Sequence, residues 1–113
     1  MEASSGSQPE LRLTAAPGGS WTVLAVTGEL DLVTAADFGD GLRHHLAGGP
    51  VLLDLSALSF MDSSGVRTLG EVLRDAAREG WTLAVRPEMQ PTVRQVLDIT
   101  GMMGVLPMHQ ELT

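Results

Sequence analysis

Residues 51–80 read VLLDLSALSFMDSSGVRTLGEVLRDAAREG, and this stretch predicts a buried strand followed by the most regular helix of the chain. Residues 51–55 are almost continuously apolar, a pattern typical of a central strand covered on both faces. From Ser63 onward the spacing becomes helical, with apolar residues at Val66, Leu69, Leu73, Ala76 and Ala77. Gly80 follows, where a glycine commonly ends a helix. The stretch therefore indicates an α/β fold.

The residues before this stretch predict a β-hairpin and a first helix. Residues 11–14 and 21–27 alternate apolar and polar side chains across a turn at residues 17–19, which read Pro-Gly-Gly. Thr34 and Asp37 fit a capping box, with the Thr34 side chain as the helix cap and Asp37 in the first turn. Apolar residues at helical spacing carry this helix on to a Gly-Gly-Pro sequence that ends it.

The residues after Gly80 predict a further strand and helix. Residues 81–85 alternate as a strand, and Pro91 suits the first turn of a helix that Gly101 ends. Residues 105–106 suggest a last short strand, and residues 109–113 the start of a helix. The predicted order is ββαβαβα, which forms a mixed β-sheet with helices packed on it. We expect residues 1–10 to be a disordered tail and residues 11–113 to form one domain.

Composition argues against several classes of partner. The chain of 113 residues has a formal net charge of −7 and seven basic residues, with no basic run. A surface for nucleic acid or for anionic membranes needs clustered cations, so we expect neither as a partner. There is no cysteine, which excludes disulfides and thiolate chemistry. No segment has the pattern of a signal peptide or of a membrane span, so we expect a cytoplasmic protein.

Residue patterns that would indicate catalysis are missing from the sequence. His44 and His45 are adjacent on a predicted helix, so their side chains point in different directions and do not form a metal site. No nucleophile elbow, phosphate-binding glycine loop or dinucleotide fingerprint occurs. We therefore expect a protein that is not an enzyme and that needs no cofactor.

The segment SFMDSSGV, residues 59–66, is expected to be an exposed loop between the buried strand and the strongest helix. One interpretation is structural, because Asp and Ser before a helix commonly cap its free N–H groups. A second is a serine hydrolase, which would need a histidine base close to Ser63 or Ser64. A third is a phosphorylation site, because a phosphate at a helix N-terminus meets free amides and the positive end of the helix dipole.

Three segments resemble the STAS domain family, and within it the bacterial anti-sigma factor antagonists. They are TGELD at residues 27–31, FMDSSGV at residues 60–66 and LDITGM at residues 97–102, in that order along nearly the whole chain. The resemblance implies partner switching. The unphosphorylated antagonist binds an anti-sigma factor with serine kinase activity and so releases a sigma factor. Phosphorylation ends the interaction, and a protein phosphatase restores it.

The resemblance also implies roles for individual residues. Ser63 matches the phosphorylated hydroxyl residue, with Asp62 beside it and Ser64 as the alternative acceptor. Asp31 matches an acidic position near the partner, although it also fits a plain turn residue. The residues expected to bind the partner are Asp31, Asp62, Ser63, Ser64, Gly65 and Arg67.

Two departures from the family pattern stand in this sequence. Val66 replaces the usual leucine after the glycine, and the chain stops at Thr113, where the family usually continues into a further helix. The alternative function is a STAS subunit of a transporter or stress-sensing complex that acts as a structural interaction module. Such modules often lack the acceptor hydroxyl, which this chain retains.

Overall fold

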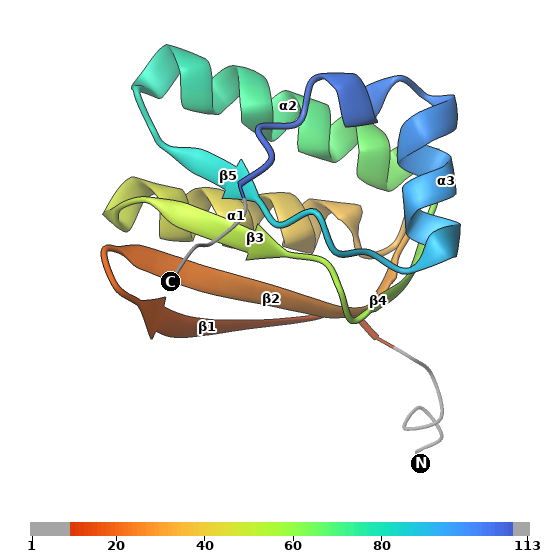
Figure 1. Ribbon diagram of the computed structural model, residues 1–113, viewed down its shortest axis with the longest axis horizontal. Coiled ribbons are helices and arrows are strands. Elements are labelled where there is room, and N and C mark those ends of the chain that lie inside the picture. Colours follow the sequence, from red (N-terminus) through yellow and green to blue (C-terminus); the bar gives the residue numbers. More distant parts are fainter. Residues whose placement is uncertain (1–9, 110–113) are drawn as a thin grey trace.

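The computed structural model describes residues 10–109 (Figure 1), so the predicted tail before residue 10 and the predicted helix start after residue 109 lie outside the described residues. Its strands are β1 (Arg12–Gly18), β2 (Trp21–Leu30), β3 (Val51–Asp54), β4 (Leu58–Met61) and β5 (Leu83–Val85). Its helices are α1 (Ala35–Gly48), α2 (Ser63–Glu79), α3 (Pro91–Ile99) and the short 3₁₀ helix η2 (Met102–Gly104). The predicted α/β fold with a mixed sheet is confirmed.

Strand β2 is the centre of the sheet because it pairs with three other strands. β1 pairs with it in antiparallel orientation along one edge. Along its other edge, the first half of β2 pairs in parallel with β3 and the last residues pair in parallel with β4. The register between β2 and β4 shifts between Gly28 and Glu29, where Gly28 has a φ of 98°. β5 then adds to β3, which completes the order β1-β2-β3-β5.

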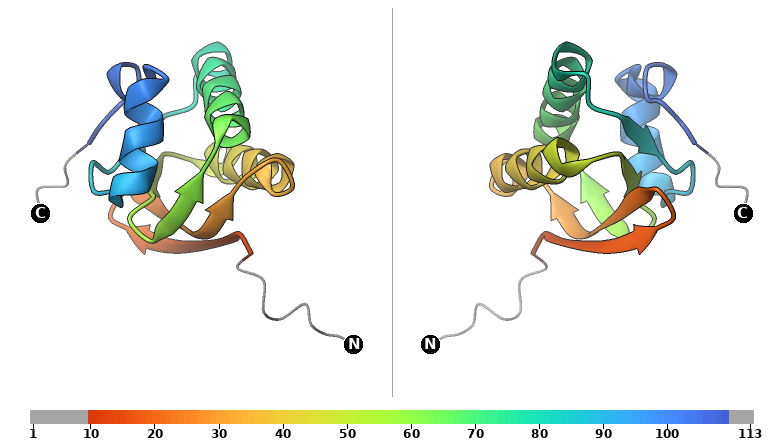
Figure 2. Two further views of the ribbon diagram at one scale, coloured as in Figure 1. Left: turned by 90° about the vertical axis from the view of Figure 1, so that its right-hand side faces the viewer. Right: turned by 90° about the vertical axis from the view of Figure 1, so that its left-hand side faces the viewer.

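The hydrophobic core lies between the sheet and the three α-helices. Figure 2 shows α1 and α2 over the sheet, with α3 on the side of α2 away from α1. Phe38 and Leu42 of α1 and Leu69 of α2 are fully buried in this core. In β3, Val51, Leu52 and Leu53 are all fully buried, as expected for a central strand covered on both faces. The core has no buried charged side chain among the described residues.

Three sequence-based expectations about local structure need correction. Residues 59–66 are not all loop, because Leu58–Met61 form β4, so the observed order is ββαββαβα. The hairpin turn lies at residues 19–20, after β1 has continued through Pro17 and Gly18. No strand forms at residues 105–106; instead η2 precedes them, and Met108 bridges to Val85 of β5.

Candidate functional site

Two parallel strands end side by side at one edge of the molecule, and each is followed by an aspartate. The register pairs Leu30 of β2 with Met61 of β4, so Asp31 and Asp62 leave the sheet as neighbours. The Asp62 N–H donates to the Leu30 carbonyl at 3.1 Å and closes this corner. Helices α1 and α2 both begin at this edge, on the right in Figure 1. The fold therefore brings the two separate candidate segments together.

Asp62 caps helix α2. Its backbone is extended, and its carboxylate accepts a hydrogen bond from the Ser64 N–H at 2.9 Å. The N–H groups of Gly65 and Val66 donate to its carbonyl. The capping interpretation is thus confirmed for Asp62, whereas Ser63 is the first residue of the helix and its side chain is exposed.

Gly65 fixes how closely the first turn of α2 approaches the sheet. It is buried, and a Cβ atom there would lie 2.6 Å from Cγ of Leu30 and 3.1 Å from Cγ of Met61. Such distances are too short for carbon atoms, so a side chain would push α2 away from the ends of β2 and β4. Gly65 therefore allows the first turn of α2, which includes Ser63 and Ser64, to pack directly against the ends of β2 and β4.

Asp31 organises the turn between β2 and α1. Its Oδ1 accepts hydrogen bonds from the N–H groups of Val33 and Thr34, at 3.0 and 3.1 Å. The Thr34 hydroxyl accepts from the Asp31 N–H and donates to the Glu29 carbonyl. Thr34 stands at the N-cap of α1 but makes no side-chain capping bond, so the predicted capping box is wrong. Its hydroxyl is occupied by the turn instead.

The same turn displays two aliphatic side chains. Leu32 is 78% exposed and Val33 is 85% exposed, although most large aliphatic residues of the described chain are buried. Sequence reasoning missed both residues because it continued from the strand directly to the helix cap. The signal that was available is an aliphatic pair placed between a turn-forming aspartate and a helix start, where no core face exists for it.

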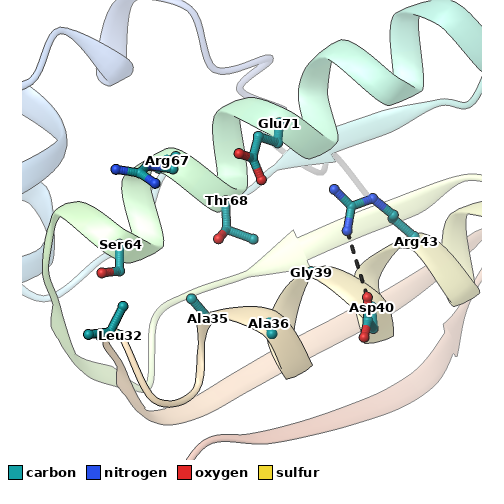
Figure 3. Close-up of a pocket in the computed structure, with 10 residues that line it drawn as sticks. All are labelled: Leu32, Ala35, Ala36, Gly39, Asp40, Arg43, Ser64, Arg67, Thr68 and Glu71. Carbon is teal, nitrogen blue, oxygen red and sulfur yellow. Dashed lines mark ion pairs between the residues drawn. The ribbon is translucent and has the colours of Figure 1, made fainter.

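A groove of about 420 Å³ runs between α1 and α2 from this edge (Figure 3). It is lined by Leu32, Ala35, Ala36, Gly39, Asp40, Arg43, Ser64, Arg67, Thr68 and Glu71. Leu32 and Ser64 lie together at one end of it. Arg43 pairs with Asp40 and with Asp75, whereas Arg67 is exposed and makes no ion pair within residues 10–109. Arg67 is therefore available to an anion at the start of α2.

On the other side of the turn lies a hollow with acidic walls. It is lined by Glu10, Leu11, Leu13, Glu29, Asp31, Val33, Thr34 and Asp37. Of its four carboxylates, Asp31 is engaged with the turn, and no cationic side chain is among the lining residues. The turn that carries Leu32 and Val33 thus separates a groove of mixed charge from an acidic hollow.

The described histidines lie away from Ser63. His44 and His45 stand near the end of α1, about 14 Å along the helix from its start at this edge. The His109 ring lies 5.1 Å from the ring of Trp21, the first residue of β2, whereas Ser63 lies near the opposite end of that strand. Within residues 10–109 no group of three or more potential ligands is placed to hold a metal ion. None of the helices in that range is both long and apolar enough to cross a membrane.

Two carboxyl groups with altered pKa values stabilise the fold outside the candidate site. Hydrogen bonds from Arg43 and then Arg78 lower the pKa of Asp75, at distances of 2.8 and 2.6 Å. Burial acts to raise the pKa of Asp54, but hydrogen bonds from Ser56 and the charge of Arg86 together lower it. Each carboxylate forms a structural ion pair. Asp75 pairs with Arg43 and links α1 to α2, and Asp54 pairs with Arg86 and links β3 to the end of β5.

Comparison with protein families places this arrangement among known domains. A family model described as "Mlab, STAS domain" matches residues 13–107. The match runs from β1 through η2 and includes both segments that form the site edge.

Solved structures of anti-sigma factor antagonists have the same fold. One from Mycobacterium paratuberculosis is 25% identical, with a TM-score of 0.77, and the match covers 91% of this chain and 88% of that one. The unphosphorylated antagonist SpoIIAA is 22% identical, with a TM-score of 0.67 and coverage of 90% and 88%. The phosphorylated form of SpoIIAA from Bacillus is 21% identical, with a TM-score of 0.61 and coverage of 90% and 91%.

Proposed function

This chain belongs to the STAS domain family, and we propose that it is an anti-sigma factor antagonist that works by partner switching. The unphosphorylated protein binds an anti-sigma factor with serine kinase activity and releases a sigma factor. The kinase transfers the γ-phosphoryl group of ATP to the Ser63 hydroxyl, which ends the interaction. A protein phosphatase hydrolyses phospho-Ser63 and restores binding. Ser64 remains the alternative acceptor.

The observation that carries the proposal is the position of Ser63. Its side chain is exposed on the first residue of a 17-residue helix, directly after the Asp62 cap. A kinase can reach this hydroxyl without unfolding any element. Ser64, by contrast, is half-buried in the groove between α1 and α2, and its N–H is occupied by the Asp62 carboxylate. Ser63 is therefore the better acceptor on access alone.

Phosphorylation at this position is tolerable within the fold and disruptive to an interface. A phosphate on Ser63 would lie at the N-terminus of α2, close to the positive end of the helix dipole. Arg67, one turn further along the same helix, can pair with it. The same phosphate adds about −1.5 to −2 charges at neutral pH. Enclosed in an interface next to Asp62, that charge would oppose binding through repulsion and lost hydration.

The test begins with capture of the kinase from host extract by the wild-type protein in the presence of ADP. The captured protein is then purified and incubated with ATP and with wild type, Ser63→Ala or Ser64→Ala. Mass spectrometry of the products is expected to place one phosphate on Ser63 in wild type and in Ser64→Ala, and none in Ser63→Ala. Ser63→Ala is expected to bind the kinase as tightly as wild type.

Two outcomes would contradict the proposal. A phosphate that persists in Ser63→Ala and is lost in Ser64→Ala would move the acceptor to Ser64. The proposed switch would also be wrong if the purified kinase modified neither residue and bound wild type and Ser63→Asp equally well.

The second candidate is a STAS subunit of a transporter or stress-sensing complex. It is favoured by the description of the matching family model, which names Mlab rather than an anti-sigma factor antagonist. In that case both Ser63→Asp and wild type would retain the same large assembly, and Ser63 would only begin a helix. The retained, accessible hydroxyl supports the antagonist instead.

A further inference from the structure

The turn between β2 and α1 is held by hydrogen bonds and carries two exposed aliphatic side chains. Leu32 and Val33 are 78% and 85% exposed, and the turn below them is held by the hydrogen bonds of Asp31 and Thr34. A surface that is already ordered loses little conformational entropy on binding. Exposed aliphatic residues on an ordered turn are therefore suited to insertion into a partner.

We propose that Leu32 and Val33 are the apolar anchors of the kinase-binding surface and that Asp31 acts by positioning them. This inference rests on the proposed function and names the contacts of the same site. The Asp31 carboxylate is engaged by the Val33 and Thr34 N–H groups within its own turn. Because its Oδ1 holds two N–H groups of the turn, the contribution that we assign to Asp31 is the shape of the turn rather than a charge presented to the partner.

The surroundings of the turn define the chemistry of the complementary surface. On the Val33 side lies the acidic hollow, where Glu10, Glu29 and Asp37 line a wall that includes no cation. A recess of apolar residues with Lys or Arg on the corresponding rim would complement both features. The kinase is therefore expected to receive the two aliphatic side chains in an apolar recess with a basic rim.

The location of Leu32 connects anchoring to the switch. Leu32 and Ser64 line the same end of the groove between α1 and α2 (Figure 3), and Ser63 is the residue before Ser64. A partner that covers Leu32 also covers the start of α2. A phosphate on Ser63 would then lie at the margin of an apolar contact, where an unpaired charge is most costly.

The first experiment measures the affinity of the purified kinase, with ADP, for Leu32→Ser and Val33→Ser. Burial of a full aliphatic side chain accounts for about a tenfold or larger change in affinity, so each variant is expected to bind at least about tenfold more weakly. Val105→Ser is the matched control, because Val105 is a 65% exposed aliphatic residue outside this turn. Its affinity is expected to equal that of wild type. Phosphorylation of Ser63 is also measured at a saturating concentration of the kinase. Normal phosphorylation under this condition shows that a variant binds the kinase more weakly but still has an intact phosphorylation site.

The second experiment separates position from charge at Asp31. Asp31→Asn removes the charge but keeps the Oδ1 acceptor, whereas Asp31→Ala removes both. Binding is expected to be within about threefold of wild type for Asp31→Asn and at least about tenfold weaker for Asp31→Ala. Equal losses in both variants would show that the charge itself contacts the partner, and would overturn the positioning role.

The outcomes distinguish this inference from the function on which it rests. Wild-type affinity in Leu32→Ser and Val33→Ser, with Ser63 still phosphorylated, would overturn the anchors and leave the antagonist function intact. A wild-type chain that neither binds nor is modified by the kinase would overturn both.

Discussion

The two aspartates at the site edge have equivalent positions and different effects. Asp31 follows Leu30 and Asp62 follows Met61, and these two residues are paired in adjacent parallel strands. Asp62 leads straight into α2 and caps it. Asp31 leads into a turn of three further residues before α1 begins, and its carboxylate accepts hydrogen bonds from two N–H groups of that turn. The difference is the length of chain between strand and helix.

That difference divides the proposed binding surface into two parts. At α2 the short connection places an exposed hydroxyl at a helix N-terminus, where a phosphate would be favourably placed. At α1 the longer connection lifts two aliphatic side chains into solvent. The comparison teaches that a strand end followed by Asp exposes different side chains according to how many residues precede the helix: a serine at the start of α2, and two aliphatic residues before α1.

The largest expected effect is at the start of α2. Ser63→Asp places a permanent charge beside Asp62 and is expected to weaken kinase binding by about 100-fold to 1000-fold, as an unpaired interfacial charge does. Isothermal titration calorimetry with ADP present measures the change. Thr92→Asp, an exposed position on α3, is the charge-matched control and is expected to have little effect. Equal weakening by both variants would point to net charge rather than to this position.

The next effect concerns the packing of the first turn of α2 against the ends of β2 and β4. Gly65→Ala is expected to lower the free energy of unfolding by about 1–3 kcal/mol, because its Cβ would overlap Leu30. Gly70→Ala on the same helix is the control, since its Cβ would lie 3.4 Å from the flexible end of Met102. It is expected to stabilise the protein by up to about 1 kcal/mol. Urea denaturation compares the two, and a stable Gly65→Ala variant would refute the packing argument.

A smaller effect distinguishes the two aspartates directly. Asp62→Ala removes one capping hydrogen bond and is expected to cost about 1 kcal/mol of unfolding free energy. Asp31→Ala removes the acceptor for two backbone N–H groups, so its cost is expected to be greater, about 1–2 kcal/mol. Thermal and urea unfolding of both variants test the order, which would be reversed if the turn were held mainly by Thr34.

The smallest effect is a pH dependence of the link between the two helices. The folded pKa of Asp75 is lowered by Arg43 and Arg78, so its stabilising contribution is present above the ordinary value of about 3.9 and is lost as pH falls through the folded value. Asp75→Asn is therefore expected to be less stable than wild type at pH 7, with a difference that shrinks toward pH 3. Urea denaturation across this range measures it. Asp40→Asn is the control, because its exposed carboxylate lies 3.8 Å from Arg43 and is expected to contribute little.

The sequence was sufficient where periodicity is strong and local. The apolar run of β3 and the helical stripe of α2 identified both elements, although the stripe missed Val72, which is buried, and included Ala77, which is exposed. Strand β4 was missed because only its first and last residues, Leu58 and Met61, are buried. Its strand character comes from pairing with the end of β2, which no local pattern reveals.

The candidate site was predictable in its identity and not in its geometry. The sequence placed Asp31 and the segment around Ser63 on one surface through resemblance alone. Which side chains of that surface are free depended on hydrogen bonds across a turn, and these engaged Asp31 and Thr34 while exposing Leu32 and Val33. Residue type alone does not predict which of several local hydrogen bonds a side chain makes. The Thr34 hydroxyl could have capped the helix, but it bonds within the turn instead.

The divided pairing of β2 also sets an order of events during synthesis. The β1–β2 hairpin is complete at Leu30, but the strand that pairs with its last residues ends only at Met61. At about 5–20 residues per second, a ribosome needs roughly 2–6 s to make the intervening chain. Throughout that interval the last residues of β2 present unpaired backbone groups to any other strand. We therefore expect a chaperone to help this protein most during the interval between completion of the β1–β2 hairpin and synthesis of β4.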